Sequence, residues 1–84
     1  MTALPRELLP DNAAIDDTGR LSIGGCDVLD LAEEFGTPLF VYDEEHLRRR
    51  CREAREVFGD GGAIYASKAF LCRAMARLAH EEGL

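Results

Sequence analysis

Apolar residues recur at helical spacing in three stretches of the chain. The first spans residues 28–35, where Asp27 is suited to cap the helix N-terminus. The second spans residues 44–58 and follows Asp43, another good cap for an acidic first turn. The third has its apolar positions between residues 71 and 79 and ends at the following Glu-Glu-Gly. The pattern therefore predicts three amphipathic helices.

Short β-prone runs alternate with these helices. Residues 17–20 indicate a turn, and residues 21–23 then predict a hairpin strand. Compact apolar runs at 39–42 and 63–66 predict two further strands. The order of strand and helix implies an α/β architecture with parallel strands. Residues 1–18 contain two prolines, several aspartates and little periodicity, which favours a loosely held arm.

Composition narrows the possible functions. Eighty-four residues make at most one small domain, and the apolar and charged fractions are ordinary for a folded protein. The net charge of −6 argues against a nucleic-acid partner, and the arginines between residues 48 and 55 alternate with glutamates as on a solvated helix face. No apolar run is long enough for a membrane span, and the start of the chain does not resemble a signal peptide.

The three cysteines are far apart and form no Cys-x-x-Cys pair, so neither a disulfide scaffold nor a metal site is predicted. This cysteine usage is consistent with a reducing cytoplasm. His46 and His80 are interpreted as helix-surface residues and not as metal ligands. Cys72 is expected to be a small buried residue on a helix face, and the glycines at 59–62 are expected to form a helix-to-strand turn and not a phosphate loop.

Lys68 is the residue with the most distinctive chemistry. It is the only lysine in a chain that has nine arginines, and it follows an apolar run directly. Beside Ala66, Ala69 and Phe70, its amine is expected to be partly desolvated, which favours the neutral and nucleophilic form. Arginine stays charged and could not replace it. Position and composition alone leave a second interpretation open, in which Lys68 is an ordinary surface residue at the start of a loop.

Three segments in register carry a resemblance to a known family. Residues 65–71, YASKAFL, resemble the sequence around the lysine that binds pyridoxal 5′-phosphate (PLP) in decarboxylases with an alanine-racemase-like barrel. Residues 21–25, LSIGG, and 31–43, LAEEFGTPLFVYD, resemble the opening of diaminopimelate decarboxylases. The residues after Lys68 differ from those usual in alanine racemases and in eukaryotic-type ornithine decarboxylases. The resemblance therefore favours diaminopimelate decarboxylase.

The resemblance implies a fold and a role for two residues. Residues 1–42 would be an arm and strands that join a β-domain in the full-length family, and residues 43–84 would begin a PLP-binding (β/α)₈ TIM barrel, which takes about 250 residues in full. Lys68 would bind PLP as a Schiff base. Ala66, two residues earlier on a strand, would face the same side and leave room beneath the cofactor. Tyr65 would point the opposite way, toward packing.

The implied reaction converts meso-2,6-diaminopimelate to L-lysine, the last step of bacterial lysine biosynthesis, in a cytoplasmic homodimer. The family's phosphate loop, the acidic partner of the pyridine nitrogen and the substrate-binding residues are expected beyond residue 84, so the 84 residues alone are expected to be inactive. Two alternatives remain. One is another PLP barrel decarboxylase, acting on ornithine, arginine or carboxynorspermidine. The other is a small acidic interaction domain without enzymatic function.

Overall fold

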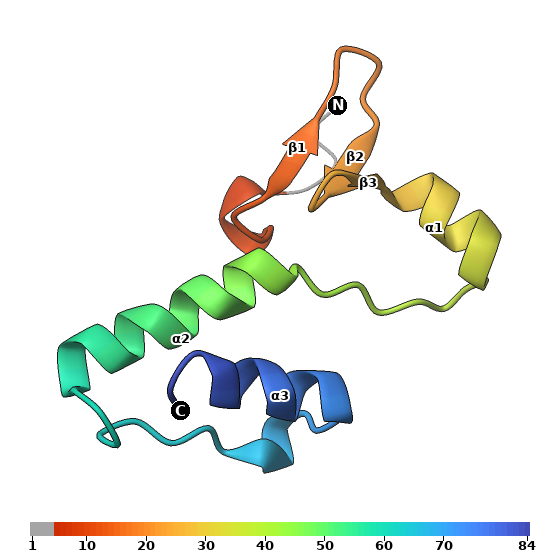
Figure 1. The fold of residues 1–84 in the computed structure, drawn as a ribbon. Helices are drawn as coiled ribbons and strands as arrows, with labels where there is room; N and C mark the ends of the chain where they lie inside the picture. The colour runs from red at the N-terminus through yellow and green to blue at the C-terminus, as the bar shows by residue number, and fades with distance from the viewer. Residues whose placement is uncertain (1–4) are drawn as a thin grey trace. The chain divides into compact units, whose positions relative to one another are not determined.

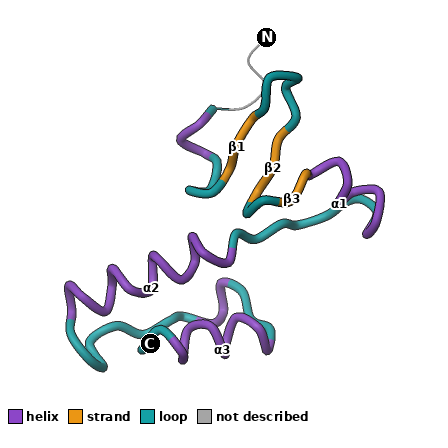
Figure 2. The backbone as a smooth tube through the Cα atoms, turned by 45° about the horizontal axis from the view of Figure 1, so that its top comes forward, coloured by secondary structure: helices purple, strands orange, loops and turns teal. Residues whose placement is uncertain are grey.

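The computed structural model describes residues 5–84, which form two compact units, one ending at His46 and the other running from Leu47 to Leu84. Figures 1 and 2 follow the chain through its elements. In chain order, the elements are the 3₁₀ turn η1 (Arg6–Leu8), β1 (Ala13–Ile15), β2 (Leu21–Ile23), β3 (Cys26–Asp27), α1 (Val28–Phe35), α2 (Glu44–Phe58), the 3₁₀ turn η2 (Ser67–Ala69) and α3 (Arg73–Glu81).

The first unit is built around a three-stranded antiparallel sheet in the order β1-β2-β3. Ala13 pairs with Ile23 and Ile15 pairs with Leu21, so the predicted strand at 21–23 is confirmed. Asp16 shapes the turn between β1 and β2, because its Oδ1 accepts hydrogen bonds from the Thr18 hydroxyl (2.7 Å) and from two backbone N–H groups. These bonds, led by the one from the Thr18 hydroxyl, hold the pKa of Asp16 below its ordinary value of 3.8.

Helix α1 begins as its sequence predicts. Asp27 caps it by accepting hydrogen bonds from the N–H groups of Leu29 (2.8 Å) and Asp30 (3.2 Å). The same carboxylate pairs with Arg20 from the turn after β1, at 2.6 Å. The hydrogen bond from the Arg20 guanidinium is the main reason that the pKa of Asp27 falls to about 2. One carboxylate thus joins the β1–β2 turn to the start of α1.

A second carboxylate joins the residues before β1 to the start of α2. Asp43 is 6% exposed and accepts hydrogen bonds from the backbone N–H of Asn12 (3.0 Å), from Asn12 Nδ2 (3.1 Å) and from the backbone N–H of His46 (3.1 Å). His46 Nδ1 in turn accepts a hydrogen bond from the backbone N–H of Asp11 (2.9 Å). The predicted cap at Asp43 is confirmed, and the cap also holds residues 11–12 in place.

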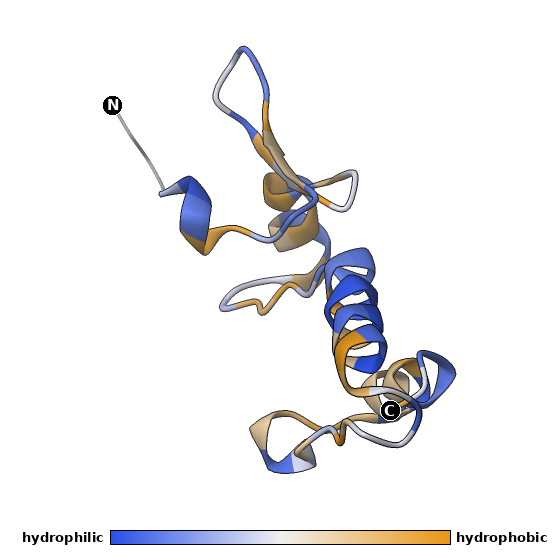
Figure 3. Cartoon of the chain, turned by 90° about the vertical axis from the view of Figure 1, so that its left-hand side faces the viewer, coloured by the Kyte–Doolittle hydropathy of each residue, from blue (hydrophilic) through white to orange (hydrophobic). Residues whose placement is uncertain are grey.

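The second unit has a small apolar core between two helices. Cys51 of α2 is buried with Met75, Leu78 and Ala79 of α3, and four partly buried side chains pack against this cluster: Leu47, Tyr65, Phe70 and Leu84. The polar residues of α2 lie outside the core, and Figure 3 shows hydrophilic character over most of this helix.

Ion pairs join the arginine-bearing part of α2 to the end of α3. Glu82 binds Arg48 and Arg52, each at 2.9 Å, and Arg48 also binds Glu81 at 2.9 Å. Hydrogen bonds from the Arg52 and Arg48 side chains hold the pKa of Glu82 below its ordinary value. The arginines interpreted as a solvated face therefore include two that bridge the two helices of this unit.

Two predicted strands are absent from the part of the chain that the structure describes. Residues 39–42 and 63–66 are irregular, and the sheet that does form is antiparallel, so the prediction of parallel strands at these positions is wrong for residues 5–84. A β-prone run becomes a strand only where a neighbouring strand accepts and donates its backbone hydrogen bonds. The loose arm is also wrong in part, because β1 lies within residues 5–18 and pairs with β2. The first residues of the predicted arm, 1–4, lie outside the described part.

Candidate functional site

Lys68 lies in the middle of a short turn of the second unit. The turn is η2, Ser67–Ala69, and Ala66 precedes it in an extended conformation. A hydrogen bond from the Ala69 N–H to the Ala66 carbonyl (3.1 Å) closes the turn. Phe70 then returns to an extended conformation before α3 begins at Arg73. The chain thus makes one tight projection between two extended residues, with the lysine at its centre.

Both ends of this projection are attached to the core of the unit. Tyr65, just before it, and Phe70, just after it, pack against the buried cluster of α2 and α3. The Tyr65 hydroxyl donates a hydrogen bond to the Phe70 backbone carbonyl. Residues 65–70 therefore form a loop whose ends are tied to the core and to each other; this segment is called the lysine loop below.

The expected desolvation of Lys68 is not observed among the described residues. Lys68, Ala66 and Ala69 are all exposed, and only Phe70 of the predicted neighbours is partly buried. The reason is geometric, because the tight turn directs residues 66–69 away from the core and the alanine side chains are too small to cover a lysine amine. Ala66 lies at the start of a 3₁₀ turn and not on a strand, so strand alternation does not relate it to Lys68.

The cysteine beside the loop also differs from its prediction. Cys72 is exposed and caps α3, since its Sγ accepts a hydrogen bond from the Met75 N–H at 3.4 Å. The expectation that Cys72 is buried on a helix face is therefore wrong, because α3 begins at Arg73, two residues after the start of the apolar pattern, and Cys72 precedes the helix. Cys51 is the buried cysteine, and its burial, followed by the nearby Glu82 carboxylate, raises the pKa of its thiol.

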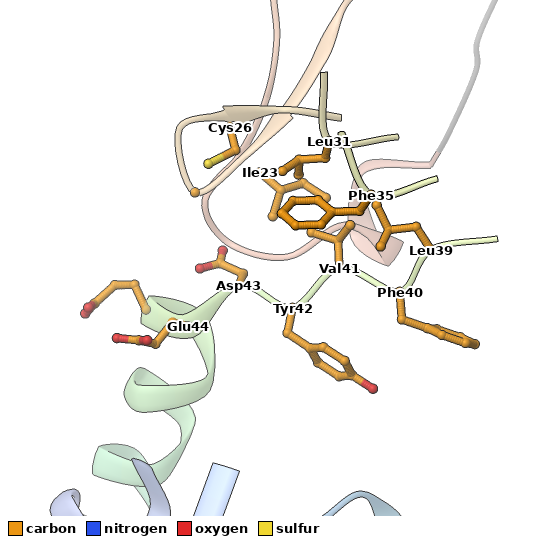
Figure 4. Close-up of a pocket in the computed structure, with 12 residues that line it drawn as sticks. Ile23, Cys26, Leu31, Phe35, Leu39, Phe40, Val41, Tyr42, Asp43 and Glu44 are labelled. Atoms are coloured by element: carbon orange, nitrogen blue, oxygen red, sulfur yellow. The ribbon is translucent and has the colours of Figure 1, made fainter. Parts of the chain in front are cut away.

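The first unit carries a separate apolar groove of about 630 Å³. It is lined by side chains of β2, α1 and the segment 39–45, with acidic residues at one end. Figure 4 shows Ile23, Phe35 and Val41 directed toward one another, whereas Phe40 points away and is 85% exposed. The alternation along 39–42 follows the period of a β-strand although no strand forms there. The groove contains no lysine and is distinct from the lysine loop.

Within residues 5–84, no group of three or more His, Cys, Asp or Glu side chains is arranged to hold a metal ion. His46 instead accepts a backbone hydrogen bond through Nδ1. Over the same residues, no helix has the length and apolar character that a membrane crossing requires.

The chemistry of the lysine loop fits an aldehyde cofactor such as PLP. A lysine amine is the side-chain group that condenses reversibly with aldehydes. Lys68 is the chain's only lysine, and it lies on an exposed turn. The adjacent Ala66 and Ala69 leave space around it. The hydrogen bond between Tyr65 and Phe70 was not foreseen, because the sequence contains no pattern that pairs a tyrosine hydroxyl with a carbonyl five residues later.

Comparison with known proteins gives a consistent result. No protein-family model matches the chain. Curated diaminopimelate decarboxylases are similar to it: the protein of Mycobacterium tuberculosis is 50% identical over 76 residues, or 89% of the chain, and that of Corynebacterium efficiens is 48% identical over 96% of the chain. The protein of Synechocystis sp. is 44% identical over 94% of the chain.

The chain spans only 17–18% of the length of these relatives. Within that span the similarity covers both units and includes the lysine loop, since the aligned 96% and 94% of the chain leave out only a few residues. The resemblance predicted from three short segments is therefore confirmed over nearly the whole chain.

Proposed function

Because this chain is a homologue of diaminopimelate decarboxylases over nearly all of its length, we propose that it is a segment of a PLP-dependent carboxy-lyase that converts meso-2,6-diaminopimelate to L-lysine. Lys68 is the residue that binds the cofactor in this proposal. The observation that carries it is the coincidence of two independent facts: the similarity to decarboxylases, and the presentation of the chain's only lysine at the tip of an anchored loop.

Lys68, Ala66 and the lysine loop as a whole each have a defined part in the proposal. Lys68 supplies the primary amine, which in its neutral form is the nucleophile toward an aldehyde. Ala66 leaves space beside the cofactor because its side chain is a single methyl group. When bound, PLP supplies the electron-accepting ring that makes loss of an α-carboxylate feasible. The residues from Tyr65 to Phe70 keep the amine at a fixed place relative to the core.

Further parts of the proposal rest on the resemblance. The longer polypeptide forms a (β/α)₈ barrel that begins within residues 43–84, preceded by strands of residues 1–42 that contribute to a β-domain. It acts as a homodimer in the cytoplasm. The free state of Cys26, Cys51 and Cys72 supports a reducing compartment.

The decisive experiment compares wild type with Lys68→Ala in the longest natural polypeptide that contains this sequence. We expect wild type to show the visible absorbance band of lysine-bound PLP and to release L-lysine from meso-diaminopimelate. We expect Lys68→Ala to show neither. Lys68→Arg is the matched control, because it keeps the positive charge and length but has no amine that condenses with an aldehyde.

Two other results would redirect the assignment. A band in wild type without lysine formation would favour a PLP decarboxylase for ornithine, arginine or carboxynorspermidine, and release of carbon dioxide from each amino acid would identify which. If wild type and Lys68→Ala both lacked the band, the enzymatic proposal would be wrong. A small acidic interaction domain would then be the better interpretation of the net charge of −6.

A further inference from the structure

We propose that Tyr65 is a positioning residue for Lys68: its hydroxyl, by bonding to the Phe70 carbonyl, holds the lysine loop in the shape that presents the amine to an aldehyde. This inference rests on the proposed function and adds a residue to it. The proposal concerns the hydroxyl group in particular, because the aromatic ring of Tyr65 has the separate task of packing on the core.

The first step of the argument is the attachment of the loop. Tyr65 and Phe70 are partly buried against the cluster of Cys51, Met75, Leu78 and Ala79, whereas Ala66, Ser67, Lys68 and Ala69 between them are exposed. Two neighbouring points of one rigid core thus fix the ends of a four-residue projection. The position of Lys68 depends on how firmly those ends are held together.

The second step is the role of the hydroxyl. The backbone bond from Ala69 to Ala66 closes the turn internally, but it does not tie the turn to the residues that flank it. The bond from the Tyr65 hydroxyl to the Phe70 carbonyl does so, because it links the first residue of the lysine loop to the last. A carbonyl at this partly buried place also needs a donor, since an unpaired buried polar group is costly.

The third step connects this bond to chemistry. Lys68 Nζ would hold PLP through a C=N bond in place of the C=O bond of its aldehyde, with the aldehyde oxygen and the two amine hydrogens released as water. A mobile amine must lose conformational freedom before it reaches this geometry, whereas a held amine does not. Loss of one hydrogen bond from the loop is expected to weaken PLP binding about 2- to 10-fold.

The test uses three variants of the longest natural polypeptide that contains this sequence. Tyr65→Phe removes the hydroxyl and keeps the ring. Tyr42→Phe is the matched control, because Tyr42 is the chain's only other tyrosine and belongs to the first unit. Leu78→Val loosens the buried cluster without touching the hydroxyl, and so reports what a general loss of packing does.

Two quantities are measured for each variant. The first is the dissociation constant for PLP, from titration of its visible absorbance band. The second is amide hydrogen exchange in a peptide covering residues 66–71, recorded without cofactor, which reports the opening of the lysine loop independently of activity. The proposal expects both quantities to rise in Tyr65→Phe. It expects neither to rise in Tyr42→Phe. It expects Leu78→Val to speed exchange throughout α3 as well as in the lysine loop, whereas Tyr65→Phe speeds exchange in the lysine loop alone.

Each contrary result has a definite meaning. Unchanged exchange at residues 66–71 in Tyr65→Phe would overturn the role of the hydroxyl in holding the loop. Faster exchange with wild-type PLP affinity would overturn its role in positioning Lys68. If wild type itself bound no PLP, the proposed function would fall; if wild type bound it and Tyr65→Phe bound it equally well, only the positioning role would fall.

Discussion

Replacing Asp43 with alanine is the sharpest test of how the first unit is held together. The Asp43 carboxylate is buried and accepts three hydrogen bonds, two from Asn12 and one from the N–H of His46. Burial alone would raise its pKa, but the bonds from the Asn12 side chain, the His46 N–H and the Asn12 N–H together lower the pKa below its ordinary value of 3.8. The carboxylate therefore stabilises the folded unit while it is ionised.

The expected magnitude follows from what alanine leaves unpaired. Loss of a helix N-cap costs about 1 kcal/mol. The N–H of Asn12, which is partly buried, would lose its acceptor, at a further cost of about 1–3 kcal/mol. Because the bonds share one carboxylate and are not additive, we expect a total of about 2–3 kcal/mol. That loss corresponds to amide exchange roughly 30- to 150-fold faster at Asn12 and His46.

Asparagine at position 43 distinguishes the two oxygens of the carboxylate. Oδ1 accepts from Asn12 Nδ2 and from the His46 N–H, and Oδ2 accepts from the Asn12 N–H. An amide oxygen at the Oδ1 position would keep the cap on α2, so Asp43→Asn should preserve slow exchange at His46 and lose it at Asn12. Residue-resolved exchange in the longest natural polypeptide measures both amides in one experiment.

The control for Asp43 is Asp30→Ala, which removes a carboxylate of the same unit whose side chain is 75% exposed. It should leave exchange at Asn12 and His46 unchanged. The reasoning would be refuted if Asp43→Ala changed these two amides no more than Asp30→Ala did. Lowering the pH should mimic Asp43→Ala, because the contribution of a carboxylate with a lowered pKa is present above pH 3.8 and is lost as the pH falls through the folded-state value.

Two further predictions concern single side chains. The Asp27 carboxyl should titrate near its folded-state pKa of about 2 in an NMR titration, so the cap on α1 should persist at pH 3.8 and be lost only as the pH falls through about 2. Arg20→Gln should move the midpoint back toward 3.8, and an unmoved midpoint would contradict the assigned cause. Iodoacetamide at pH 8 should alkylate Cys26 and Cys72 well before Cys51, because Cys51 is buried with a raised pKa; equal rates by mass spectrometry would refute this.

The helices could be predicted from the sequence because their signals are local. Asp27 and Asp43 cap α1 and α2 as their positions indicated, and both helices end where glycine follows the last apolar residue. Capping and the 3.6-residue period depend on residues within a few positions of each other. Local signals of this kind do not depend on what the rest of the chain does.

The strands were predicted less well because strand formation depends on a partner. The run at 39–42 has the alternating exposure of a strand, yet it is irregular in the structure. At β1 the opposite error occurred. Ala13–Ile15 was predicted to be part of a loose arm, but it forms a strand because it pairs with β2. β-propensity describes suitability for a half-buried pleated surface, and the sequence of one segment does not say whether that surface exists.

The sequence predicts which residue carries the candidate site, but it does not predict the surroundings of that lysine. Composition and resemblance both pointed to Lys68, and the structure places it on an exposed turn and not in a desolvated pocket. Its neighbours in sequence could not have supplied that pocket, because Ala66 and Ala69 lack the atoms to cover a long side chain. What they supply is access and a short connection to the anchors Tyr65 and Phe70.

The exposure of Lys68 and the attachment of its loop to the core are compatible if other parts of a larger fold desolvate Lys68. In residues 5–84, only five apolar side chains are buried, while twelve large ones, including Phe40 and Ile64, are exposed. Exposed apolar surface on this scale is typical of a segment that packs against more chain, and the relatives are about six times as long. Desolvation of Lys68 then requires the additional chain, whereas positioning of its amine requires only the lysine loop. This division predicts that Tyr65→Phe alters PLP binding through the order of the loop, which amide exchange at residues 66–71 reports without cofactor.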